Sequence, residues 1–137
     1  MVEPAQRVTV EDVRKLALPL GTRVVAGDGL LNRVVNWATV IYPEDAGTNK
    51  AFQEGEMLLV ASHEDETATN TNDIDVVRWA SDRKACAVVL TENPSPTAIA
   101  DANAYGVPIL ALPNGSRIRL VEKQIVSLLV DHKGQIE

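Results

Sequence analysis

The fold is decided by the stretch Ala85–Leu90, which reads ACAVVL, and by two similar runs, Met57–Ala61 (MLLVA) and Val107–Leu112 (VPILAL). Each run is short, almost wholly apolar and followed by a polar segment that carries helix signals. Strands that are covered by helices on both faces have no polar side, so continuous apolar runs of this length are typical of buried parallel strands. The sequence therefore predicts a single α/β domain with a mainly parallel sheet and crossover helices.

The size and charge of the chain narrow the function classes. Its 137 residues, 45% hydrophobic and 23% charged, suffice for one domain with one core. A net charge of −6 leaves no basic face for phosphate backbones, so we expect no direct contact with nucleic acid. No stretch approaches the roughly 18 apolar residues that span a bilayer, and residues 1–7 have neither a basic region nor a following apolar segment. We expect a cytoplasmic protein without membrane contact.

Capping signals predict three helices, and apolar spacing predicts a fourth. Thr9–Asp12 forms a capping box that predicts a short helix over 9–18. Asn72 is expected to cap a second helix, and the Ser95-Pro96 pair begins a third that ends at Gly106 and covers 96–105. Apolar residues at helical spacing then predict a longer amphipathic helix over 116–133.

An N-terminal β-hairpin is expected from two β-rich segments, 22–26 and 33–42, because the glycine-containing turn Gly27–Gly29 separates them. The same turn partly matches a dinucleotide-binding fingerprint. It lacks the third glycine and does not open a helix, so the hairpin interpretation is preferred.

No set of residues in the sequence identifies a particular chemical reaction. The phosphate-binding loop, the nucleophile elbow and the zinc-protease motif are all absent from the sequence. His63–Glu66 (HEDE) has the side chains of a cation site, but a solvated acidic loop is favoured because adjacent loop residues rarely converge on one ion. Cys86, the single cysteine, lies in an apolar run without a neighbouring base and is interpreted as core. Trp37 and Trp79 are interpreted as core or subunit contacts rather than ligand platforms. We expect no catalytic residue, metal or cofactor.

A ligand crevice is expected at the carboxyl ends of the parallel strands, because open α/β sheets bind ligands there. Short polar side chains follow the strands at that edge and suit a small polar ligand, although each also fits a turn or cap role. The candidate ligand-binding residues are Ser62, His63, Thr91, Glu92 and Asn93.

Several stretches resemble the N-terminal domain of PucR-type purine catabolism regulators. They include Asn32–Trp37 (NRVVNW), Gly55–Leu59 (GEMLL) and Gly106–Pro108 (GVP), and the likeness covers about residues 8–130. The strand and helix order around Gly55–Ala61 is also loosely similar to the N-terminal uridine-nucleotide-binding domain of Mur ligases.

The first resemblance implies a non-catalytic, bacterial sensory domain of a transcriptional regulator. Its ligand would be a small polar metabolite of the purine or ureide class, and the domain would form a homodimer. On this interpretation residues 1–7 are a flexible N-terminus, 8–130 the sensory domain and 131–137 the start of a linker. Two alternatives stay open, a homodimerisation module without a ligand and a nucleotide-binding domain. A third alternative is an enzyme in which His63 acts together with Glu64 or Glu66.

Overall fold

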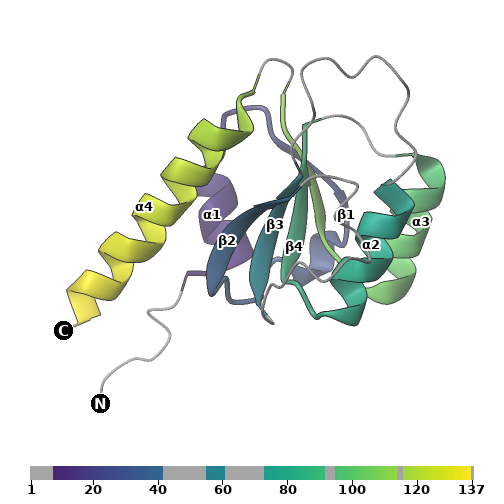
Figure 1. Ribbon diagram of the computed structural model, residues 1–137, viewed down its shortest axis with the longest axis horizontal. Helices are drawn as coiled ribbons and strands as arrows, with labels where there is room; N and C mark the ends of the chain where they lie inside the picture. Colours follow the sequence, from purple (N-terminus) through teal and green to yellow (C-terminus); the bar gives the residue numbers. More distant parts are fainter. Residues whose placement is uncertain (1–7, 42–54, 61–72, 92–94, 114–115, 137) are drawn as a thin grey trace.

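A computed structural model describes residues 8–41, 55–60, 73–91, 95–113 and 116–136 (Figure 1). The expected flexibility of residues 1–7 and the expected cap at Asn72 lie outside these residues. The elements follow in the order α1 (Val10–Leu16), β1 (Arg23–Ala26), the 3-10 turn η2 (Asp28–Leu30), β2 (Trp37–Ile41), β3 (Glu56–Val60), α2 (Asp73–Asp82), β4 (Ala87–Leu90), α3 (Pro96–Tyr105), β5 (Ile109–Ala111) and α4 (Ile118–Ile136).

The strands form one five-stranded sheet in the order β1-β5-β4-β3-β2. Strands β2, β3, β4 and β5 run parallel, and β1 pairs antiparallel with β5 at the edge. The mainly parallel α/β sheet expected from the apolar runs is therefore confirmed, with β2 as a fourth parallel strand.

The expected N-terminal hairpin is wrong, because β1 and β2 occupy opposite edges of the sheet. Gly27 adopts a left-handed conformation (φ +68°) and begins η2 instead of a two-residue turn between paired strands. The chain then pairs at Val34 with Thr9 in an isolated antiparallel bridge before it enters β2. The excursion carries the chain from one edge of the sheet to the other.

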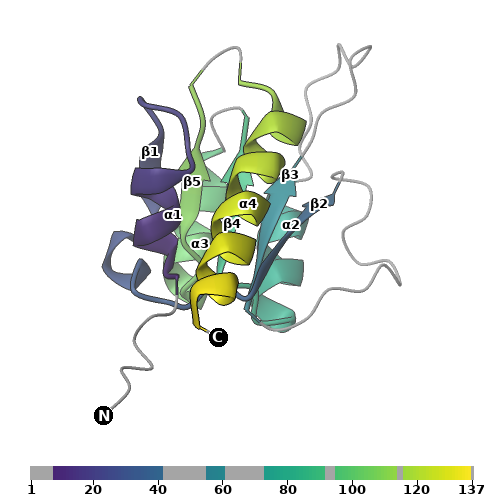
Figure 2. The same cartoon turned by 90° about the vertical axis from the view of Figure 1, so that its left-hand side faces the viewer.

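Helices cover both faces of the sheet. Figure 2 looks onto the face with α1 and α4, while α2 and α3 lie behind the sheet. In β3, Met57 and Leu59 belong to the apolar cluster under α1 and α4, whereas Leu58 belongs to the cluster under α2 and α3, and all three are fully buried. This two-sided burial explains why the strand sequences show no polar alternation.

Local signals set the helix ends. In α1 the Thr9 hydroxyl accepts from the Asp12 amide at 3.2 Å and the Asp12 carboxylate accepts from the Thr9 amide at 3.0 Å, which confirms the capping box. Ser95 caps α3 and Gly106 ends it at φ +77°, as expected. The last helix begins at Ile118 and reaches Ile136, three residues beyond the expected end. Within the described part of the chain, no helix is long and apolar enough to span a bilayer.

Candidate ligand pocket at the amino edge of the sheet

Most of the candidate site residues lie outside the described part of the chain. Ser62, His63, Glu92 and Asn93 are in this group, so the expected crevice at the carboxyl edge stays a prediction. Thr91 is described, and it lies half-buried directly after β4 at that edge. The acidic run at 63–66 is also outside the description, and the described residues contain no cluster of three or more potential metal ligands.

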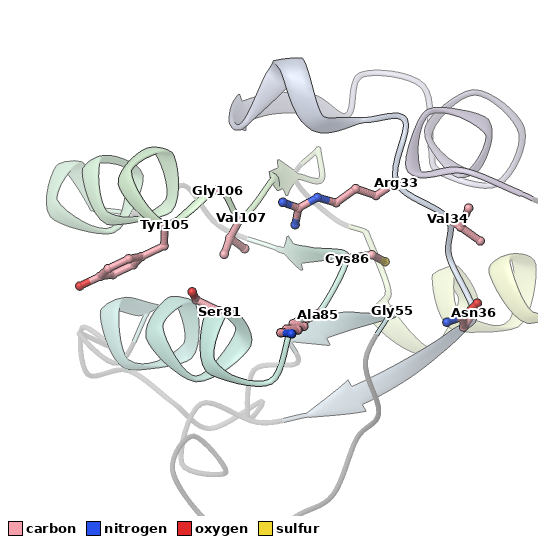
Figure 3. Close-up of a pocket in the computed structure, with 11 residues that line it drawn as sticks. Arg33, Val34, Asn36, Gly55, Ser81, Ala85, Cys86, Tyr105, Gly106 and Val107 are labelled. Carbon is pink, nitrogen blue, oxygen red and sulfur yellow. The ribbon is translucent and has the colours of Figure 1, made fainter.

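A cavity of about 630 Å³ lies at the other end of the strands, where the amino ends of the parallel strands meet (Figure 3). We call this end the amino edge of the sheet. Its volume falls in the range of about 300–1,000 Å³ that is usual for small-molecule sites. Three connections and the residue directly before β3 line the cavity. The lining residues are Arg33, Val34 and Asn36 before β2, Gly55 before β3, Ser81, Lys84, Ala85 and Cys86 between α2 and β4, and Tyr105, Gly106 and Val107 between α3 and β5.

Backbone hydrogen bonds hold these walls together. The Asn36 amide donates to the Gly55 carbonyl, and the Gly55 amide donates to the Lys84 carbonyl, both at 2.9 Å. The Arg33 carbonyl accepts from the Val10 amide at 2.9 Å, which ties the Arg33 segment to the start of α1. The cavity is therefore formed by fixed backbone rather than by a loose surface loop.

Gly55, Lys84 and Gly106 of the pocket lining have positive φ angles, and Lys84 is the one that is not glycine. Gly55 has φ +86°, a conformation that other residues rarely adopt, and a Cβ there would overlap the side-chain amide of Asn36. Lys84 has φ +61°, in the left-handed region that non-glycine residues rarely adopt. It follows the end of α2, a position where glycine is common because it adopts this conformation without strain. A strained non-glycine residue on a pocket wall is a feature often found at functional sites.

Cys86 lines the pocket but is itself buried. Cys86 is 3% exposed and belongs to the core cluster under α1 and α4, which confirms its interpretation as a core residue. Burial raises the pKa of its thiol from an ordinary 9.0 to about 12. Such a thiol stays protonated at neutral pH and is a poor nucleophile. Trp79 is likewise buried in the core, whereas Trp37 on the edge strand β2 is 38% exposed.

We expect Cys86 to be unreactive in the folded protein. A thiol reagent such as Ellman's reagent at pH 8 should modify it only as fast as the protein unfolds, and at once in denaturant. Because the folded pKa lies above the ordinary value, ionisation favours the unfolded state, so stability should fall as the pH rises from about 9 towards 12. Cys86→Ala should lose this alkaline component of the pH profile. Rapid labelling under native conditions would contradict the buried, protonated thiol.

A second, smaller hollow lies between the end of α1 and the start of α4. It has a volume of about 280 Å³, and its lining includes Leu16, Leu18, Leu120 and Val121. Leu16 and Leu120 are 69% and 56% exposed. This hollow is mainly apolar and suits a contact with another apolar surface better than a polar ligand.

Sequence reasoning gave no site role to Arg33, Ser81, Lys84 or Tyr105, which line the larger cavity. Arg33 stands in a stretch that carries the family resemblance, but nothing in its local pattern marks it as a pocket residue. At Lys84, the absence of a glycine after α2 was the available signal, because that position then forces a strained backbone.

Comparisons with known proteins agree with the fold. The model of the purine catabolism regulatory protein-like family matches residues 12–129. Comparison with curated protein sequences gives no match. A similar solved structure is the regulatory region of Clostridium perfringens pyrophosphatase, comprising CBS and DRTGG domains and complexed with its activator diadenosine tetraphosphate. It shares 12% identity and a TM-score of 0.58 over 91% of this chain and 48% of that chain, so the chain spans about half the length of that structure. At this identity the likeness shows the fold alone.

Proposed function

The chain belongs to the purine catabolism regulatory protein-like family, and from this we propose that it is a ligand-sensing regulatory domain rather than an enzyme. The family match spans nearly all of the described helices and strands. The observation that carries the ligand-sensing role is the cavity of about 630 Å³ at the amino edge of the sheet. We propose that a small polar metabolite of the purine or ureide class occupies it.

The chemistry of the lining favours binding without turnover. The described residues that line the cavity include no histidine or carboxylate that would move a proton at neutral pH. Cys86 does not supply a nucleophile, because burial raises its pKa to about 12. The remaining polar side chains, including Arg33, Asn36 and Ser81, donate hydrogen bonds and suit recognition.

A route from the pocket to the last helix supports a regulatory output. The segment with Arg33 and Asn36 leads directly into β2, and α4 packs against β2. A ligand that binds one arrangement of this segment more tightly than another would shift the population of α4 positions. In a longer regulator, α4 would pass this change to the region that follows it.

A thermal-shift screen of the 137-residue chain tests the proposal. The probes are xanthine, uric acid, allantoin, allantoate, adenosine and AMP. A specific ligand should stabilise the native state by about 2.7 kcal/mol at a hundredfold excess over its dissociation constant. It should also change hydrogen exchange in residues 118–130 of α4. The absence of any shift with every probe at millimolar concentration would contradict a purine- or ureide-sensing role.

The apolar hollow between α1 and α4 favours a second candidate function, assembly of two copies without a ligand. Leu16 and Leu120 expose apolar surface there, and a stable interface needs about 1,000 Å² of buried area in total. Light scattering over a range of concentrations would show a dimer that Leu120→Glu dissociates. A monomer at every concentration would exclude this candidate.

A further inference from the structure

We propose that the pocket at the amino edge is an anion site, in which Arg33 and Lys84 bind the carboxylate or phosphate group of a small organic ligand. This inference rests on the proposed function, namely that the domain binds a small molecule in this cavity. It adds the chemical class of that molecule and the side chains that select it.

The charge of the pocket is opposite to that of the chain. The protein carries a net charge of −6, yet the described lining residues include Arg33 and Lys84 and no carboxylate. Arg33 is half-buried, and its guanidinium forms no ion pair with a carboxylate among the described residues. By contrast, Arg14 pairs with Glu11, Arg78 with Asp101 and Arg119 with Glu122. A half-buried guanidinium that pairs with no carboxylate of the described residues is suited to an anionic ligand.

The helix dipoles at this edge oppose an anion, and Arg33 and Lys84 act against them. Helices α2 and α3 both end here, and each carboxyl end acts as roughly half a negative charge. Two such ends amount to about one negative charge, and the Glu56 carboxylate at the start of β3 adds to them. They stand against the positive charges of half-buried Arg33 and exposed Lys84. At Cys86 in the pocket lining, the positive charge of Arg33 has a larger effect than the negative charge of Glu56.

Most backbone amides of the lining are already occupied, so side chains are the main donors for a ligand. The amides of the lining residues Asn36, Gly55, Lys84, Ala85, Cys86, Gly106 and Val107 all donate to carbonyls of the protein. Arg33 thus provides the strongest anion donor, and its planar fork matches the two oxygens of a carboxylate or phosphate.

The placement of Arg33 leaves room for the rest of a ligand. Figure 3 shows its side chain reaching from the segment before β2 towards Gly106 and Val107, above Cys86 and Ala85. A Cβ added to Gly106 would lie 3.6 Å from Arg33 Nη2, so the guanidinium and this connection are in close proximity. Tyr105 and Ser81 lie beyond it on the ends of α3 and α2. The cavity of about 630 Å³ is much larger than a free anion, and the space between these groups fits an organic body attached to the anionic group.

Isothermal titration with two matched pairs of probes tests the anion site. Allantoate carries a carboxylate that allantoin lacks, and AMP carries a phosphate that adenosine lacks. We expect the anionic member of at least one pair to bind the 137-residue protein at least tenfold more tightly than its neutral partner. The pair that shows the difference identifies carboxylate or phosphate as the recognised group. The preference should weaken between 50 mM and 500 mM salt because the charges are partly exposed.

Variants assign the effect to the pocket. Arg33→Ala should weaken binding of the preferred anion at least tenfold. Arg33→Lys should weaken it less, because lysine keeps the positive charge but lacks the planar set of N–H donors. Arg119→Ala is the matched control, since it removes the same charge from an arginine that is paired with Glu122 on α4. Lys84→Gly removes the second cation and also relieves the positive φ, so it should weaken anion binding several-fold without lowering the melting temperature.

The outcomes separate this inference from the proposed function. If a neutral probe binds as tightly as its anionic partner and Arg33→Ala changes neither affinity, the anion site is wrong while ligand sensing stands. If no probe binds the wild-type protein, both fail. If Arg33→Ala does not fold, Lys84→Gly decides, because wild-type affinity for the anion in that variant would overturn the proposal.

Discussion

Leu59→Ala is expected to lower the free energy of unfolding by about 3 kcal/mol, within the range of about 2–5 kcal/mol for such truncations in protein cores. Leu59 is fully buried in β3, between Val40 of β2 and Val89 of β4 in the sheet register. The substitution removes apolar surface from the cluster under α1 and α4 and leaves a cavity, because neighbouring strands on both sides prevent collapse. Urea denaturation followed by circular dichroism measures the free energy of unfolding. We expect its slope against urea concentration to stay unchanged.

Leu20→Ala is the matched control for this truncation. Leu20 is 100% exposed, so the same change of side chain should alter the free energy of unfolding by less than about 0.5 kcal/mol. Equal effects at Leu59 and Leu20 would contradict the assignment of β3 to the buried centre of the sheet.

The sequence predicts those parts of this fold that depend on local chemistry. The runs around Leu58 and Val88 are apolar at every position because helices cover both faces of the sheet, and that pattern is visible without a structure. The third helix is also predictable from end to end, since Ser95 and Gly106 satisfy its two ends locally. The hairpin prediction was wrong because it concerned contacts that local chemistry does not set. Strand pairing is non-local, and nothing near Gly27 shows that β1 pairs with β5.

The candidate pocket was less predictable than the fold. Open α/β sheets generally bind ligands beyond the carboxyl ends of their strands, so the sequence predicts a site at the carboxyl edge. The larger described cavity lies at the amino edge. Arg33 and Lys84 are separated by some fifty residues, and only the crossing of the chain to the β2 edge brings them to one cavity. Lys84 also has a backbone conformation that its residue type disfavours, which local propensity does not predict. The buried position of Cys86 was predictable, because its neighbours in the sequence are apolar.

Gly27→Ala is expected to destabilise the protein by about 3 kcal/mol, since a left-handed conformation costs an L-residue roughly 1–2 kcal/mol and overpacking typically adds 1–3 kcal/mol. Gly27 has φ +68°, and a Cβ there would lie 2.7 Å from Pro108 Cα and 2.9 Å from Pro108 N. These atoms are backbone at the start of β5, so no flexible side chain can move aside. The melting temperature and urea midpoint of the variant measure the loss.

Gly29→Ala provides the control two residues away, inside η2. No atom lies within 4 Å of a Cβ at Gly29, and its φ is not positive. Alanine there should be neutral or stabilise by up to about 1 kcal/mol, because it restricts the unfolded chain. The contrast tests the close approach of η2 to β5, which positions Val107 in the pocket wall. Equal stability of the two variants would mean that the turn does not pack against Pro108, and the pocket wall at Val107 would then lack this support.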